Sequence, residues 1–223
     1  MTSANGHFRS LFLSDFHLGS RIGKGERLYR FLCEHNAETI YLIGDIVEVN
    51  VLSKWPPFHI DCIRELARKA LAGTRIIYIP GNHDRGFRHH AGVFGNLHIR
   101  RRANHFAADG SVWLVVHGDE TDLLPHGWWL RLLVLFEHLT GKSLWEKLRD
   151  NFGGIIRRHG DRYERKMRKL AYGYAGVICG HIHSPKIDGS YINAGDWTRH
   201  CTAIAEHHDG RFELIGDILE TRT

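Results

Sequence analysis

The stretch SLFLSDFH, residues 10–17, joins a short apolar run to two residues that can bind a metal, Asp15 and His17. The run Ser10–Leu13 has the length and composition of a buried strand. Four later runs of this kind also end in residues with side-chain oxygen or nitrogen atoms: Thr39–Ile43 before Gly44 and Asp45, Arg75–Ile79 before Pro80–Asp84, Val112–Val116 before His117, and Gly176–Cys179 before Gly180–His183. Because ligands of an α/β sheet gather at the carboxyl ends of its strands, we expect these side chains to meet at one edge.

Helical patterns separate the first of these strands. They span Gly25–Glu34 and Asp61–Leu71, with Asp61 as the expected first residue of the second helix. Apolar residues recur on one face of each: Leu28, Phe31 and Leu32 in the first, and Ile63, Leu66, Ala67 and Ala70 in the second. Three more strands are expected near the C-terminus: Tyr191–Asn193, Thr202–Glu206 and Arg211–Ile215. Strands that alternate with helices predict an α/β core, and the closing strands predict a mixed or second sheet.

The composition is that of an ordinary globular domain. The chain has 223 residues, of which 43% are hydrophobic and 25% charged, and its formal net charge of +5 favours an anionic partner. The four cysteines form no CxxC pair, which argues against a thiolate zinc site and for reduced thiols. The longest apolar segment, Trp128–Phe136, contains Arg131 and is too short to span a bilayer. We therefore expect a cytoplasmic protein.

Residues 123–172 differ from the rest of the chain and predict a helical insertion. The predicted core then comprises residues 1–122 and 173–223. Trp128–Leu139 is apolar, whereas Lys142–Lys169 holds ten basic residues against four acidic ones, a larger excess than the net charge of the whole chain. Such a run is usually a solvated helix face. Because it lies beside the strand ends, contact with an anionic substrate is an alternative of equal weight.

The residues at the five strand ends have the chemistry of a two-metal site. Two cations about 3.5–4 Å apart can hold a phosphoryl group and activate a water molecule. Such cations repel each other, so an anionic bridge is needed, and Asp45 can supply it. The further nitrogen and oxygen ligands are Asp15, His17, Asn82, His117, His181 and His183. This set, which lacks thiolates, suits two divalent ions of Mn, Fe or Zn, with Mn²⁺ as the first expectation.

The motifs DxH, GD, GNHD, HG and GHxH occur in this order between Asp15 and His183, and together they resemble the calcineurin-like metallophosphoesterases. The resemblance implies an αββα sandwich of two mixed sheets. It also implies that one metal binds Asp15, His17 and His183, and that the other binds Asn82, His117 and His181, with Asp45 between them. His83 matches the histidine that faces the phosphate oxygens or the leaving group. Asp84 matches the acid that orients this histidine.

Within that family, the chain resembles the UDP-2,3-diacylglucosamine hydrolases (pyrophosphatases) of lipid A synthesis. The resemblance rests on four segments: LFLSDFHLG at 11–19, TIYLIGDIVE at 39–48, VVHGDETD at 115–122 and NAGDWTRHCTAIAEH at 193–207. It implies that the insertion is a lid over the site. Known members of that branch have Arg where this chain has His83, which leaves the substrate open.

A nucleotide-linked lipid would suit a lid that is apolar in one part and basic in the next, with peripheral contact at the inner membrane. The basic residues expected to contact such a substrate are Arg157, Arg158, Arg165 and Lys166. Two alternatives remain. One is a phosphodiesterase or phosphatase for soluble nucleotides or nucleic acid, although aromatic residues are sparse in Lys142–Lys169. The other is a non-catalytic scaffold, which would be expected to have lost some ligands. Asp119, Asp122 and Asp196 are expected to be solvated or capping residues.

Overall fold

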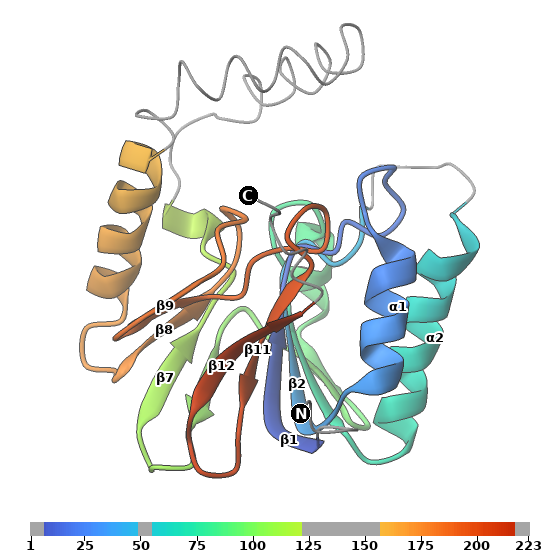
Figure 1. Cartoon of the computed structure of the whole chain (residues 1–223), viewed down its shortest axis with the longest axis horizontal. Coiled ribbons are helices and arrows are strands. Elements are labelled where there is room, and N and C mark those ends of the chain that lie inside the picture. Colours follow the sequence, from blue (N-terminus) through green and yellow to red (C-terminus); the bar gives the residue numbers. More distant parts are fainter. Residues whose placement is uncertain (1–6, 49–54, 122–156, 217–223) are drawn as a thin grey trace, which may run out of the picture.

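The computed structural model describes residues 7–48, 55–121 and 157–216. Within them, twelve strands form two mixed sheets (Figure 1). In sheet order, the first sheet consists of β12 (Phe212–Gly216), β11 (Thr202–Glu206), β1 (His7–Leu13), β2 (Asn36–Ile43), β3 (Arg75–Ile79), β5 (Leu97–Ile99) and β4 (Gly92–Phe94). The second consists of β6 (Ala103–Phe106), β7 (Val112–Val115), β8 (Gly176–Cys179), β10 (Tyr191–Asn193) and β9 (Lys186–Asp188).

The parallel strands of both sheets bring their carboxyl ends to one rim of the molecule. Strands β1, β2, β3 and β5 are parallel to their neighbours in the first sheet, and β7, β8 and β10 are parallel in the second. The remaining strands pair antiparallel at the edges. The loops that carry the predicted ligands therefore leave the two sheets at the same end.

Helices cover the outer faces of both sheets. Helices α1 (Gly25–Glu34) and α2 (Pro57–Leu71) pack on the first sheet through a core that includes Leu11, Phe31 and Leu66. A helix over residues 157–170 packs on the second sheet, where Tyr163 and Met167 are buried. A third core lies between the sheets. These layers form the αββα sandwich (Figure 1), and the predicted fold class is confirmed.

The sequence prediction was wrong about the start and the buried face of α2. The helix begins at Pro57, a residue suited to the first helical turn, and not at Asp61. Ile63 is 38% exposed, whereas Lys69 is only 2% exposed. The ammonium of Lys69 donates to the backbone oxygen of His35 at 2.9 Å and to Oδ1 of Asn36 at 2.7 Å. Lys69 therefore lies on the buried face of α2, where an apolar residue was expected. Its aliphatic stem is buried, and its ammonium group forms hydrogen bonds at the end of that stem.

The predicted insertion is described only in part. Residues 123–156, including the apolar Trp128–Phe136, lie outside the described residues, and the limits of the insertion stay a prediction. Residues 157–170, which we assigned to it, form the outer helical layer over the second sheet. No helix in the described ranges is long and apolar enough to cross a membrane.

Candidate metal centre

The predicted ligands lie on sharp turns immediately after the strands. Asp15 and His17 follow β1, Asp45 follows β2, and His181 and His183 follow β8. Within the described residues, these five and Cys201 are the residues other than glycine that have positive φ angles, between 48° and 72°. Such angles disfavour ordinary side chains and occur mainly where function or surrounding structure requires them. The backbone at this rim is thus bent in a way that turns the ligand side chains inward.

Glycines next to the ligands leave space for this approach. A Cβ atom on Gly44 would collide with the ring of His117, and one on Gly81 would collide with the carboxylate of Asp45. A Cβ atom on Gly180 would collide with Ser14, whose hydroxyl donates to Asp15. Any side chain at these positions would displace a candidate ligand, which explains the glycines in the GD, GN and GH motifs.

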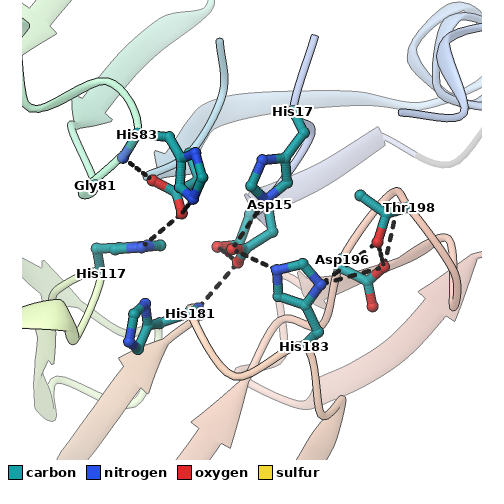
Figure 2. A network of polar contacts seen from close by, with 12 residues as sticks. Asp15, His17, Gly81, His83, His117, His181, His183, Asp196 and Thr198 are labelled. Carbon is teal, nitrogen blue, oxygen red and sulfur yellow. Dashed lines mark hydrogen bonds and ion pairs between the residues drawn. The ribbon is translucent and has the colours of Figure 1, made fainter. Parts of the chain in front are cut away.

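The turns bring the side chains into two adjoining groups, as Figure 2 shows for most of them. Ligand atoms of Asp15, His17 and His183 lie within 4.8 Å of one another, as do those of Asp45, His117 and His181. Nε2 of His183 is 3.0 Å from Oδ1 of Asp15. Nitrogen and carboxylate oxygen are donor atoms that Mn, Fe and Zn accept. The first group is the set expected for one ion, and the second joins Asp45, the expected bridging residue, to His117 and His181. Their assignment as ligands stays a proposal.

Unpaired polar atoms in this cluster fit bound cations. Oδ1 of Asp15, Nε2 of His17 and Nε2 of His117 are buried and form no hydrogen bond of normal geometry within the described structure. Oδ1 of Asp15 and Nε2 of His117 face other members of the cluster, Nε2 of His183 at 3.0 Å and Oδ2 of Asp45 at 3.4 Å. Buried polar atoms without partners are rare in proteins. Nδ1 of His117 is 2.8 Å from the backbone oxygen of Ile43, an arrangement that leaves Nε2 as the ligand atom. The residues present therefore fit divalent metal ions.

Asn82, the remaining predicted ligand, is exposed on the turn between Gly81 and His83. Its neighbour His83 is held by Asp45, because the backbone nitrogen of His83 donates to Oδ1 of Asp45 at 2.8 Å. Asn82 therefore occupies a position at the edge of the second group. Its role as a ligand stays a prediction.

The affinity for divalent metals should rise with pH. Burial lowers the pKa of His117, but the charge of Asp45 outweighs burial and raises the pKa to about 10. Burial likewise lowers the pKa of His183, and Asp15 raises it to about 9. Both metal-free rings are thus protonated at neutral pH, and a metal must displace these protons. Calorimetric titration with Mn²⁺ in buffers of different ionisation enthalpy should show proton release and tighter binding as pH rises through about 9. Affinity that is independent of pH would contradict the ligand assignment.

His83 is paired with Glu48 and not with Asp84. Its Nδ1 lies 3.0 Å from Oε1 and 2.8 Å from Oε2 of Glu48, and its side chain is 38% exposed. This hydrogen bond raises the pKa of His83, with burial opposing it, so the ring favours its protonated form. Burial raises the pKa of Glu48, but hydrogen bonds with His17 and His83 outweigh burial and lower it to about 2. The charged forms of both groups are therefore favoured in this pair, which lies beside His17.

The expectation that Asp84 orients His83 is wrong. Both carboxylate oxygens of Asp84 accept hydrogen bonds from elsewhere: Oδ2 from the nitrogen of Ile46 at 2.7 Å and from the hydroxyl of Tyr78 at 2.6 Å, and Oδ1 from the nitrogen of Gly81 at 2.5 Å. Asp84 is buried, and it joins the loop after β2 to the loop after β3. Its role is to hold the backbone that carries Asp45 and His83.

Sequence reasoning missed three residues next to the site. Glu48 follows Asp45 by three residues, and its place in the segment 39–48 was the only available signal. Asp196 is fully buried and not solvated, but it does cap a turn, accepting from the backbone nitrogens of Thr198 and Arg199. Thr198 Oγ1 lies 3.4 Å from Nδ1 of His183. These contacts orient His183 (Figure 2).

Asp119, expected to be a solvated or capping residue, forms an ion pair that ties two loops together. Nη2 of Arg88 donates to its two carboxylate oxygens at 2.7 and 2.9 Å, and Nε of Arg88 donates to the backbone oxygen of Pro80 at 3.0 Å. The loop with His83 and the loop with His117 are thereby held at a fixed separation.

The predicted lid residues lie on the helix over residues 157–170. Arg157, Arg158 and Arg165 are exposed, whereas the ammonium of Lys166 donates to the backbone oxygen of Thr121 at 2.6 Å. The same helix contacts the site through Tyr163, whose hydroxyl donates to the backbone oxygens of His117 and Gly180. Contact of these basic residues with a substrate stays a prediction.

Comparison with known proteins gives one family, and two of the solved structures that match are of low similarity. The calcineurin-like phosphoesterase family matches residues 8–185. The Pseudomonas putida nuclease MPE has 15% identity over 93% of this chain and 88% of its own, with a TM-score of 0.43. A conserved uncharacterised protein of Streptococcus pneumoniae, a predicted phosphoesterase, has 15% identity over 93% and 96%, with a TM-score of 0.33. None of the curated proteins matches. With a match over most of its length, this chain belongs to the calcineurin-like phosphoesterases, a family of metal-dependent hydrolases.

Proposed function

We propose that this phosphoesterase hydrolyses the phosphoanhydride of a nucleotide-linked lipid, UDP-2,3-diacylglucosamine or a close relative. One observation supports hydrolysis by a metal centre: the candidate ligand atoms gather in two groups. One group is formed by Asp15, His17 and His183, and the other by Asp45, His117 and His181. A non-catalytic scaffold would not need to keep this set together with His83. The choice of substrate is supported by the four sequence segments shared with the UDP-2,3-diacylglucosamine hydrolases. It is also supported by the exposed basic residues Arg157 and Arg158.

The side chains fit specific tasks in such a reaction. Bound at the two groups, two divalent ions, Mn²⁺ foremost and Fe or Zn as alternatives, would supply positive charge for the phosphoryl oxygens and lower the pKa of the attacking water. Asp45, whose Oδ1 accepts from the nitrogen of His83 while Oδ2 faces Nε2 of His117 at 3.4 Å, would supply negative charge that balances the two ions. The protonated ring of His83 would donate to a phosphate oxygen or the leaving group, and Glu48 would hold it there.

A hydrolysis panel with Mn²⁺ tests the substrate. It contains a UDP-linked diacylated sugar, a cyclic dinucleotide, a short single-stranded oligonucleotide and an aryl phosphodiester. The proposal expects the highest kcat/KM for the UDP-linked lipid, with release of UMP. Preferential turnover of the cyclic dinucleotide or the oligonucleotide would replace this substrate by a soluble nucleotide or nucleic acid. Absence of turnover for all four would contradict a hydrolase of this type.

Neutralising the exposed arginines at the start of the described helix should weaken substrate binding. Arg157→Ala and Arg158→Ala should raise KM for the UDP-linked lipid several-fold, up to about tenfold, because each guanidinium can bind phosphate through two N–H groups. Arg165→Ala and Lys166→Ala should act in the same direction. Kinetics of the aryl phosphodiester should hardly change, and Lys169→Ala, an exposed position at the other end of the helix, is the matched control. Equal effects on both substrates would make this helix purely structural.

A further inference from the structure

Four exposed arginines without acidic partners lie on two segments at the rim that carries the candidate metal ligands. Arg100, Arg101 and Arg102 are consecutive and exposed, and Arg85 is exposed at the start of the short helix that follows His83 and Asp84. Within the described ranges, none of the four guanidinium groups forms an ion pair or hydrogen bond. Arg88, which lies between them in sequence, is by contrast fully engaged with Asp119 and Pro80. Four positive charges on neighbouring segments are thus left uncompensated, since the short helix that begins at Arg85 contacts β5.

The topology places this cluster at the ligand rim. Strand β5 runs parallel to β3, and Ile99, its last residue, pairs with Tyr78. The nitrogen of Arg100 then donates to the backbone oxygen of Tyr78 at 2.9 Å. On the other side, β6 begins at Ala103, which pairs with Val115 near the end of β7. The stretch 100–102 therefore crosses from one sheet to the other at the end of the molecule where the loops with His83 and His117 leave.

The cluster borders a hollow with a partly apolar lining. Arg100, Arg101 and Arg102 line a cavity of about 410 Å³ together with Val93 and Ile99. Val93 is 60% exposed and Ile99 is buried, so the lining includes both exposed and buried apolar side chains. Guanidinium groups beside low-dielectric walls attract anions more strongly than on an open surface. Their planar arrangement of N–H groups matches phosphate oxygens.

We infer that Arg85, Arg100, Arg101 and Arg102 form an anion subsite for a phosphate of the substrate other than the one attacked at the metal centre. The inference rests on the proposed hydrolysis of a phosphoanhydride, whose substrate carries two phosphates. The metal centre holds the reacting group, and the subsite binds negative charge beyond it. The subsite therefore selects diphosphates over diesters with a single phosphate.

Binding to metal-free protein tests the subsite without catalysis. Pyrophosphate is titrated calorimetrically at low salt into wild type, into the combined variant Arg100→Ala, Arg101→Ala, Arg102→Ala, and into Arg85→Ala. We expect Kd to rise roughly tenfold or more in the combined variant and less in the single one. Arg64→Ala, which removes an exposed arginine on α2, is the matched control and should bind as wild type does. Equal affinity in wild type and the combined variant would overturn the inference, provided thermal melting shows that all variants fold.

Kinetics with Mn²⁺ then identify the source of the phosphate. For a UDP-sugar, the combined variant should raise KM about tenfold with kcat retained, while both constants for an aryl phosphodiester stay at the wild-type value. Unchanged KM together with lost binding to phosphatidylglycerol vesicles, or to a single-stranded oligonucleotide, would assign the arginines to a lipid headgroup or to nucleic acid. Either result would overturn the inference. If no phosphoester is hydrolysed at all, the proposed function fails, whereas the pyrophosphate titration still decides whether the subsite exists.

Discussion

Asp45→Asn should remove most bound metal and lower kcat/KM by about 10³-fold or more. The carboxylate of Asp45 accepts from the nitrogen of His83 at 2.8 Å and faces Nε2 of His117 at 3.4 Å. Burial raises its pKa, but the charge of His117 outweighs burial and holds the pKa well below the usual range. An amide would take away the negative charge that balances two cations, and it would direct an NH₂ group toward one of them. Metal content by mass spectrometry and steady-state kinetics measure the two effects.

A carboxylate outside the site provides the control. Asp61→Asn removes an acid on α2 that pairs with Arg64 at 3.0 Å, and it should leave metal content and rate unchanged. If Asp45→Asn kept two metals per chain with a normal rate, Asp45 would not be the bridging ligand.

His83→Ala should lower kcat by roughly 10²–10⁴-fold while both metals stay bound. The ring of His83 is partly exposed and forms a third group with His17 and Glu48, whose ligand atoms lie within 4.8 Å of one another. Its Nε2 comes within 4.0 Å of Oδ2 of Asp45. Its hydrogen bond to Glu48 favours the charged form, which can donate a proton or stabilise negative charge on phosphate. The measurement is kcat for the preferred substrate beside the metal content of the same sample.

Two further variants separate catalysis from structure. His89→Ala, an exposed histidine six residues later, should behave as wild type. Glu48→Gln keeps a hydrogen-bond acceptor but loses the charge, so it should lower kcat less than His83→Ala. Because the charge of Glu48 raises the pKa of His83, its loss should shift the alkaline limb of the pH–rate profile to lower pH. Wild-type turnover by His83→Ala with intact metals would show that His83 has no catalytic role.

The strands and the ligands could be predicted because both depend on local sequence. An apolar run followed by Gly-Asp or Gly-His indicates a strand end with a polar turn, and five such runs place their ligands at one rim. Helix α1 has the limits expected from its apolar periodicity. Four strands were missed, β4, β5, β6 and β9, because they are short and, unlike the equally short β8 and β10, are not buried along their whole length.

Long-range pairing was the part that sequence could not supply. Asp84 is next to His83 in the chain, yet its carboxylate turns toward Ile46 and Gly81, and Glu48, 35 residues away from His83, orients the ring instead. The family resemblance, which assigned this role to Asp84, therefore did not reveal the contact between Glu48 and His83. For the same reason, the position of the arginines at 100–102 could not be predicted from sequence. Only the crossing between the two sheets brings them to the rim with the candidate metal ligands.

Crystallographic analysis of Mn²⁺-loaded protein, with anomalous scattering to locate the ions, tests the central claim most directly. The account predicts two ions within about 4 Å of each other, with the carboxylate of Asp45 between them. Asp15, His17 and His183 should coordinate one ion, and Asn82, His117 and His181 the other. A single ion, or Asp45 turned away from the metals, would contradict the account.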